Sequence, residues 1–118
     1  MENLVYTKEE IVENRTKVLS NIDNYEKTVE CMREADVNNK KCCCILGVLC
    51  DIFDNTCWSK IRNNHYFLGK YRFIPPDVVV EYYGLYYKQV SELIRFNDRQ
   101  DMTLKQLAET LCSMPITV

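Results

Sequence analysis

The stretch CCCILGVLCDIF, residues 42–53, is the most apolar part of the chain and decides how the fold is built. It is long for a strand, and Leu46, Leu49, Cys50 and Phe53 recur at the spacing of one helical face. We therefore predict a buried helix over this segment. Gly47 would cost such a helix about 1 kcal/mol relative to alanine, so we expect another stretch of backbone to pack closely against it.

Further helices are predicted on both sides of this segment. A threonine followed three residues later by Glu or Gln forms a capping box, in which each side chain satisfies the other residue's free backbone N–H. A proline pair followed by an aspartate also starts a helix, and glycine or Asn-Asp marks a helix end. The predicted helices run from Thr7 to a stop at Asn21–Asn24, from Pro75-Pro76 to Gly84, through Val90, Leu93 and Ile94 to Asn97-Asp98, and from Thr103, with Gln106, through Leu111.

The strand signals predict a small sheet. His65–Leu68 and Tyr71–Ile74 are expected to form a hairpin, because Gly69-Lys70 has the glycine-first order of a type II′ turn. Residues 25–33 permit a short strand, whereas residues 35–41 and 55–64 are predicted to be loops. The whole pattern predicts an α+β fold, a single domain over residues 1–118 with about four to five short helices packed on a small antiparallel β-hairpin sheet. Residues 1–6 and 113–118 are expected to be frayed.

Length and composition narrow the class of protein. The chain has 118 residues, 47% of them apolar, which allows one hydrophobic core. Its net charge of −2 argues against a protein that coats duplex DNA, since such proteins need a basic excess. No apolar run reaches the roughly 18 residues that span a bilayer, and the N-terminus lacks the pattern of a signal peptide. We therefore expect a cytoplasmic protein without a membrane partner.

The chain contains seven cysteines, Cys31, Cys42, Cys43, Cys44, Cys50, Cys57 and Cys112. An odd number in a chain without a signal peptide favours free thiols that pack as small buried hydrophobes. Zinc is disfavoured because no Cys-x-x-Cys pair is present. A nucleophile formed by Cys57 with His65 is a further alternative. We expect no metal, no cofactor and no catalytic residue.

Three stretches, read in order, resemble a widespread family of small phage-encoded proteins. They are CCILGVLCD at residues 43–51, IPPDVV at residues 74–79, and LIRFND at residues 93–98 followed by TLKQLA at residues 103–108. Family members carry a cysteine pair running into LGVLCD, then a proline-led helix, then a Leu-Asn-Asp turn before an amphipathic helix. The LGVLCD string is the most specific of the three, and this chain departs from the pattern at Ile45 and Phe96. The resemblance covers roughly residues 25–112.

The family is similar to phage sponge proteins, which bind the cyclic nucleotide signals of bacterial immunity, as in CBASS or Thoeris systems, and so keep the effectors silent. The resemblance implies a phage anti-defence protein in the cytoplasm of the infected bacterial host. It would sequester a cyclic di- or trinucleotide, or a cyclic ADP-ribose relative, without catalysis. Pockets shared between subunits are the simplest design for so short a chain, so we expect a homo-oligomer. Two alternatives stay open: a direct inhibitor of a host defence protein, and an enzyme that degrades the signal.

A sponge needs cations for phosphates and flat apolar faces for bases. The candidate ligand-binding residues are His65, Phe67 and Arg72 on one face of the predicted hairpin, Arg33, Lys40 and Lys41 as a second basic cluster, and Asn97 and Asp98 as hydrogen-bonding groups. Arg33 matches an arginine typical of the family. Each group also has an ordinary structural interpretation: a solvated sheet face, a solvated loop and a helix stop, respectively.

Overall fold

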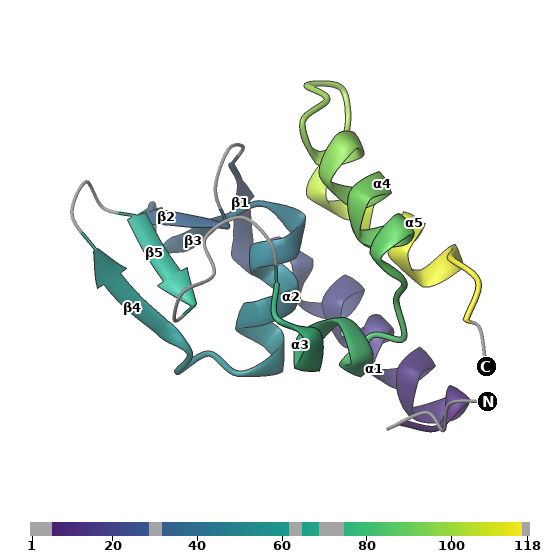
Figure 1. Cartoon of the computed structure of the whole chain (residues 1–118). Helices are drawn as coiled ribbons and strands as arrows, with labels where there is room; N and C mark the ends of the chain where they lie inside the picture. Colours follow the sequence, from purple (N-terminus) through teal and green to yellow (C-terminus); the bar gives the residue numbers. More distant parts are fainter. Residues whose placement is uncertain (1–5, 29–31, 62–64, 69–74, 117–118) are drawn as a thin grey trace.

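Helix α2, Ile45–Phe53, lies in the middle of the fold, between a sheet and the other helices (Figure 1). The computed structural model describes residues 6–28, 32–61, 65–68 and 75–116. Every residue of α2 from Ile45 to Asp51 is buried. The predicted helix is confirmed, but it begins later than expected, because Cys42 and Cys43 end a strand and Cys44 is the N-cap.

Gly47 is the point of closest approach between α2 and the rest of the chain. A Cβ atom on this residue would lie 1.8 Å from the carbonyl oxygen of Met32 and 2.7 Å from its carbonyl carbon. The same carbonyl accepts a hydrogen bond from the N–H of Cys44 at 3.2 Å. Any side chain at position 47 would collide with backbone atoms, so the predicted close packing is confirmed.

The sheet has five strands in the order β1-β3-β2-β5-β4. Its members are β1 Tyr25–Lys27, β2 Arg33–Val37, β3 Lys40–Cys43, β4 Trp58–Ile61 and β5 His65–Leu68. The β1–β3 pair is parallel and the other three pairs are antiparallel. The α+β class is confirmed, with a sheet that is mixed and larger than a single hairpin.

Two segments predicted to be loops contain strands, and those two predictions are wrong. Residues 35–41 belong mostly to the β2–β3 hairpin, whose turn residues Asn38 and Asn39 have φ values of 52° and 63°. Asparagine tolerates this left-handed backbone better than most residues, so a polar pair closes a two-residue turn. Residues 55–64 include β4, which pairs with β5. The predicted partner strand, residues 71–74, and its Gly69-Lys70 turn lie outside the described residues.

The remaining helices follow the local signals in the sequence. They are α1 Lys8–Asn21, continued by a 3-10 turn at Ile22–Asn24, α3 Asp77–Tyr82, α4 Tyr87–Asn97 and α5 Leu104–Ser113. Both predicted capping boxes, Thr7 with Glu10 and Thr103 with Gln106, are present. Gly84 ends α3 with a φ of 59°, which few other residues adopt at low cost.

Buried Arg15 of α1 ties the helices together. Its guanidinium donates to the carbonyls of Tyr83 at 2.7 Å, Gly84 at 3.0 Å and Leu111 at 3.1 Å, and also to that of Met114. These carbonyls terminate α3 and α5, where the helix dipole places partial negative charge. The carbonyl of Pro115 accepts a further hydrogen bond from the side chain of Gln89. The carbonyls of Met114 and Pro115 thus accept hydrogen bonds from α1 and α4, within the end of the chain that the sequence predicts to be frayed.

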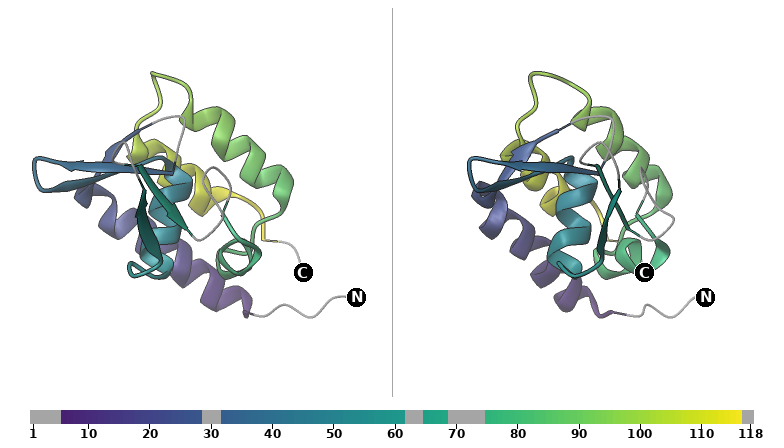
Figure 2. Two further views of the ribbon diagram at one scale, coloured as in Figure 1. Left: turned by 60° about the vertical axis from the view of Figure 1, so that its left-hand side comes forward. Right: turned by 90° about the vertical axis from the view of Figure 1, so that its left-hand side faces the viewer.

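The assembly of these elements is a single compact domain. Figure 1 shows the sheet on one side of α2 and the helices α4 and α5 on the other, and Figure 2 turns the side of the sheet toward the viewer. The Cα radius of gyration is 13.5 Å, close to the roughly 13–14 Å typical of a single domain of this length. Within the described ranges, no helix is long and apolar enough to cross a membrane.

Candidate functional site

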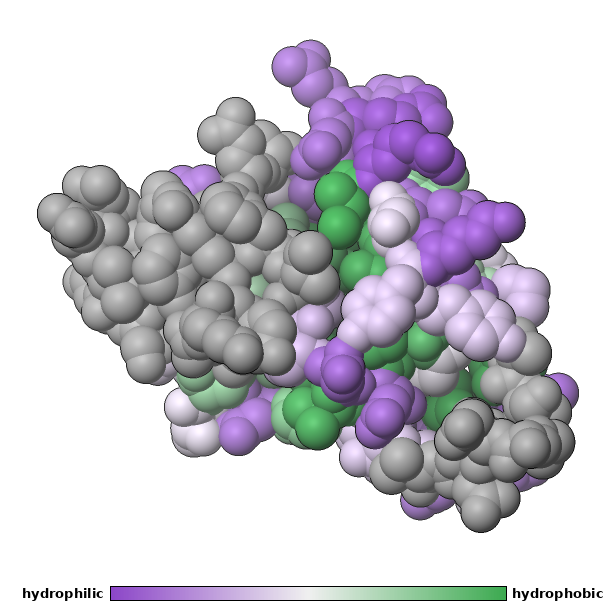
Figure 3. Space-filling view, in the orientation of Figure 1, coloured by the Kyte–Doolittle hydropathy of each residue, from purple (hydrophilic) through white to green (hydrophobic). Residues whose placement is uncertain are grey.

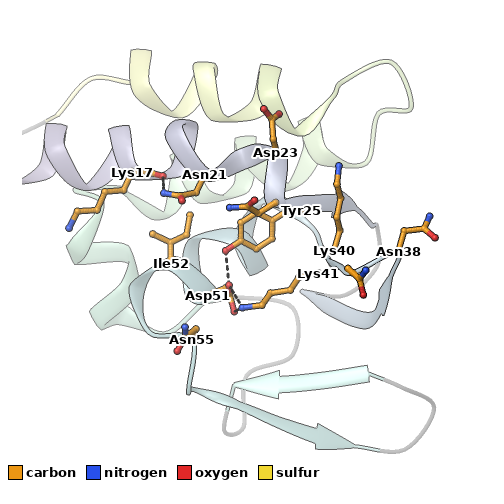
Figure 4. A pocket seen from close by; sticks show the side chains of 12 residues that line it. Lys17, Asn21, Asp23, Tyr25, Asn38, Lys40, Lys41, Asp51, Ile52 and Asn55 are labelled. Carbon is orange, nitrogen blue, oxygen red and sulfur yellow. Dashed lines mark hydrogen bonds and ion pairs between the residues drawn. The ribbon is translucent and has the colours of Figure 1, made fainter.

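A cleft of about 780 Å³ lies where the end of α1, the β2–β3 hairpin and α2 meet (Figure 4). It is lined by Lys17, Asn21, Asp23, Asn24, Tyr25, Asn38, Asn39, Lys40, Lys41, Asp51, Ile52 and Asn55. We call it the Lys–Asn cleft, because lysines and asparagines make up most of its walls. Its volume lies within the range of roughly 300–1,000 Å³ that small-molecule sites occupy.

The floor of the cleft is built around the buried carboxylate of Asp51. It accepts hydrogen bonds from the hydroxyl of Tyr25 at 2.6 Å and from the indole N–H of Trp58 at 2.8 Å. The ammonium of Lys41 lies 2.9 Å from one carboxylate oxygen, and the guanidinium of Arg33 lies 3.9 Å from the other. Figure 4 shows Tyr25 and Lys41 pointing toward Asp51. One carboxylate thus joins α2 to β1, β2, β3 and β4, and we call these five residues the Asp51 hub.

Protonation states in the hub follow from these contacts. Burial alone would raise the pKa of Asp51, but hydrogen bonds from Tyr25, Lys41 and Trp58, together with the Lys41 charge, outweigh it and lower that pKa. Burial, followed by the bond to Asp51, raises the pKa of Tyr25. Near neutral pH the carboxyl group of Asp51 is therefore ionised and the phenol of Tyr25 is neutral. In these protonation states the hydroxyl of Tyr25 donates to the carboxylate of Asp51.

The cationic wall of the cleft comes from β3 and α1. The Lys40 ammonium lies 3.8 Å from Glu26 in a pair whose side chains are 44% and 50% exposed. Such exposed pairs contribute about 0–1 kcal/mol, so an incoming anion can displace Glu26. Lys41 is 35% exposed and contacts Asp51, and the Lys17 ammonium donates to the hydroxyl of Tyr82 at 3.3 Å. Lys40 and Lys41 are therefore the cations best placed to meet a ligand.

The rest of the cleft wall consists of amides and the carboxylate of Asp23. Asn21 donates its side-chain N–H to the carbonyl of Lys17 at 2.8 Å. Among the described residues, the amides of Asn24, Asn38, Asn39 and Asn55 form no hydrogen bond with the protein. Each amide can both donate and accept, so this wall suits a ligand with hydroxyl groups or base edges.

The structure separates the residues predicted to bind a ligand. Lys40 and Lys41 line the Lys–Asn cleft, and Arg33 lies buried beneath it in the Asp51 hub. Asn97 is buried elsewhere: its oxygen accepts from the N–H of Ile45 at 2.8 Å, and its amide donates to the carbonyl of Thr28 at 3.0 Å. It thus holds the first turn of α2, while Asp98 is exposed at the end of α4.

The predicted hairpin site cannot be placed in the same way. His65 and Phe67 belong to strand β5, but their side chains lie outside what the structure describes. Arg72 also lies outside the described residues.

Cysteine chemistry receives little support from the local environments. All six cysteines within the described residues are free thiols. Burial, followed by the charges of Asp54 and Asp51, raises the pKa of Cys57 to about 11, so it is a protonated, weak nucleophile near neutral pH. Burial also raises the pKa values of Cys43 and Cys50. In the part of the chain that the structure describes, no group of His, Cys, Asp or Glu side chains is arranged to hold a metal ion.

Sequence reasoning missed the central residue of the site. Asp51 is the only charged residue in the apolar stretch of residues 42–53, and a charge buried in such a segment needs partners. That rule predicts a polar cluster around Asp51. It does not identify Tyr25, which lies 26 positions away along the chain, or Trp58, which lies seven positions away, beyond the end of α2.

We compared the chain with known proteins by sequence and by structure. No protein-family model, no curated protein and no solved structure matches it.

Proposed function

We propose that this chain is a phage anti-defence protein that binds and sequesters a cyclic nucleotide immune signal in the Lys–Asn cleft. The ligand is a cyclic di- or trinucleotide or a cyclic ADP-ribose relative, and the protein releases it unchanged. The place of action is the cytoplasm of the infected bacterial host, and the working form is a homo-oligomer. The phage origin and the signal class rest on the sequence resemblance.

The observation that carries the proposal is the composition of the cleft. Lys41 leaves β3 on the same face as the half-buried ring of Tyr25, and Lys40 leaves the opposite face, next to Asn38 and Asn39 of the hairpin turn. Cations match phosphate oxygens, amides match hydroxyls and base edges, and an aromatic ring offers a surface to a base. A phosphodiester-linked nucleotide has all three complementary groups.

The residues at the cleft floor support sequestration of the ligand without turnover. Asp51 is the carboxylate at the cleft floor, and three hydrogen-bond donors already occupy it. A general base must be able to accept a proton from a reacting group, and an occupied carboxylate with a lowered pKa is poorly suited to that task. The Cys57 thiol is likewise mostly protonated near neutral pH.

The first experiment identifies what the protein holds. Purified protein is incubated with a panel of cyclic nucleotides, free ligand is removed, the protein is heat-denatured, and the released compounds are measured by mass spectrometry. Intact nucleotide in near-stoichiometric amount is the expected result. A chemically changed product with turnover beyond one equivalent would replace sequestration by an enzyme, and an empty eluate would rule out the ligand class.

Matched variants test the cleft as the place of binding. Lys40→Ala removes a cation of the cleft wall, whereas Lys105→Ala removes an exposed cation of α5, outside the cleft. Loss of one charge-assisted hydrogen bond lowers affinity by about tenfold, so we expect that loss for Lys40→Ala and little change for Lys105→Ala. Arg72→Ala tests the hairpin site in the same assay. A loss confined to Arg72→Ala would move the site from the cleft to the hairpin.

A second candidate function, inhibition of a host defence protein by direct contact, rests on a different surface. Val78, Tyr86 and Tyr87 at the junction of α3 and α4 are 54%, 50% and 57% exposed. Figure 3 shows apolar residues at the surface along this side, next to the hydrophilic residues around α4. Exposed tyrosines are frequent anchors of protein interfaces. Capture of one host defence protein by wild type but not by Tyr86→Ser/Tyr87→Ser, with no nucleotide bound, would favour this candidate.

A further inference from the structure

We infer that the Lys–Asn cleft selects ligands by their free ribose hydroxyls, through Asp23 and the neighbouring amides, and that it favours phosphodiesters over polyphosphates. The inference rests on the proposed function and adds a specificity to it. It assigns a role to Asp23, which the sequence pattern did not single out.

Asp23 and two of the amides come from a different part of the chain than Lys40 and Lys41. Asp23 and Asn24 project from the 3-10 turn that follows α1, and Asn21 comes from the last turn of α1 itself. Lys40 and Lys41 stand on β3, and Figure 4 shows Lys41 turned toward Asp51 and Lys40 turned away from it. A ligand that spans the cleft therefore meets Asp23 and amides, together with Lys17, at the end of α1, and Lys40 and Lys41 at β3.

Asp23 is suited to accept hydrogen bonds from hydroxyl groups. It is exposed, and it forms no ion pair with any cation of the described residues. A carboxylate is an acceptor with two oxygens, and acidic residues recognise ribose hydroxyls in dinucleotide-binding folds for this reason. A 2′-deoxyribose lacks the 2′-hydroxyl, so the carboxylate loses that donor in the complex.

The charges that line the cleft set the kind of phosphate it accepts. Three lysines and two aspartates give a small positive excess, and Lys41 already neutralises Asp51. Asp23 repels a ligand with several negative charges. Phosphodiesters carry one charge for each phosphate, so a cyclic nucleotide fits this balance better than a nucleoside triphosphate does.

The test compares ribose and deoxyribose forms of the same ligands by isothermal titration calorimetry. The probes are cyclic diadenylate, cyclic triadenylate and cyclic ADP-ribose, each paired with its 2′-deoxy analogue, and adenosine triphosphate as the polyanion. We expect the bound ribose ligand to exceed its deoxy analogue in affinity by about tenfold, as for one hydrogen bond to a charged group. Adenosine triphosphate is expected to bind more weakly than the bound diester.

Asp23→Asn sharpens the test, because it keeps the size of the side chain and removes its charge. We expect the ribose preference to fall to less than about threefold and the affinity for adenosine triphosphate to rise. Glu109→Gln is the control, since it changes the net charge equally on the exposed face of α5 and should leave both affinities unchanged. A purely structural role for Asp23 would not alter the ribose-to-deoxyribose ratio.

The outcomes separate the two proposals. Equal affinities for a ribose ligand and its deoxy analogue in the wild type would overturn the hydroxyl selection and leave sequestration intact. Adenosine triphosphate binding as tightly as the diester would overturn the charge selection. No binding of any probe would overturn the proposed function together with this inference.

Discussion

Arg15 and Asp51 are the two most deeply buried charged side chains among the described residues, and the fold satisfies them in opposite ways. Arg15 is 1% exposed, and its hydrogen bonds go to main-chain carbonyls at the ends of α3 and α5. Asp51 is 4% exposed, and its partners are side chains from four strands. The first charge is enclosed among helices, whereas the second forms the floor of a cleft.

The difference indicates that the helices around Arg15 and the strands around Asp51 have different roles. Main-chain carbonyls at helix ends cannot leave their positions without unwinding the helix, so the Arg15 contacts serve stability. Side chains can exchange partners: Lys41 is 35% exposed, and its ammonium has three donors. It can contact Asp51 and a ligand at the same time, so the Asp51 hub both stabilises the sheet and presents a cation to the Lys–Asn cleft.

Removing the guanidinium of Arg15 should have the largest effect. Arg15→Met leaves four buried or half-buried carbonyls without their donor, and each unsatisfied group costs about 1–3 kcal/mol. We expect the free energy of unfolding, measured by urea denaturation, to fall by about 4 kcal/mol or more. Arg95→Met, on the exposed face of α4, should change it by less than about 0.5 kcal/mol. Similar values for both variants would show that the Arg15 contacts do not stabilise the helices.

Removing the Asp51 carboxylate should lower the free energy of unfolding somewhat less. The same variant tests the contacts at the floor of the Lys–Asn cleft. Asp51→Ala removes a carboxylate that lies 3.9 Å from the buried guanidinium of Arg33, and it takes the acceptor from Trp58 and Tyr25. Breaking a buried pair from one side costs about 3 kcal/mol, again measured by urea denaturation. Trp58 is the only tryptophan in the chain, so its fluorescence should change in the folded state of this variant. An unchanged emission spectrum would contradict the bond between the indole and Asp51.

The contribution of Asp51 to the free energy of unfolding should depend on pH in the acidic range. The folded-state pKa of Asp51 lies below its usual value, so its ionised form stabilises the protein above the unfolded pKa of about 3.9. That contribution is lost as the pH falls through the lower, folded-state pKa. The stability difference between wild type and Asp51→Asn should thus be constant from pH 7 to pH 5 and shrink below about pH 4. A difference that stays constant down to pH 2 would mean that Asp51 is not held ionised by its partners.

The smallest expected effect on stability is that of Lys41. Its ammonium is partly exposed, so solvent screens the pair with Asp51, and three other partners of the carboxylate remain. Lys41→Met should lower the free energy of unfolding by about 0.5–1 kcal/mol while weakening nucleotide binding by about tenfold. Urea denaturation measures the change in the free energy of unfolding, and calorimetry of the same sample measures the change in nucleotide affinity. A large loss of stability with unchanged binding would place Lys41 in the hub alone.

Helix starts and stops were the part of the fold most readily predicted. The capping boxes at Thr7 and Thr103, the proline-led start of α3 and the glycine at position 84 involve residues within four positions of each other. Such signals act through local backbone geometry, so they operate in almost any tertiary context. The extra strands were missed because Arg33–Val37 and Trp58–Ile61 lack clear alternation of apolar and polar residues, and only their pairing makes them strands.

By itself, the sequence determined the helical segments, the burial of residues 45–51 and the close approach at Gly47, because these depend on local propensity and on apolar content. Only the tertiary structure decided the sheet order and the gathering of Tyr25, Arg33, Lys41 and Trp58 around Asp51. Tyr25 and Asp51 are 26 positions apart, and no local rule pairs a phenol with a carboxylate over that separation. Their meeting requires that β1 and β3 pair and that α2 packs against them.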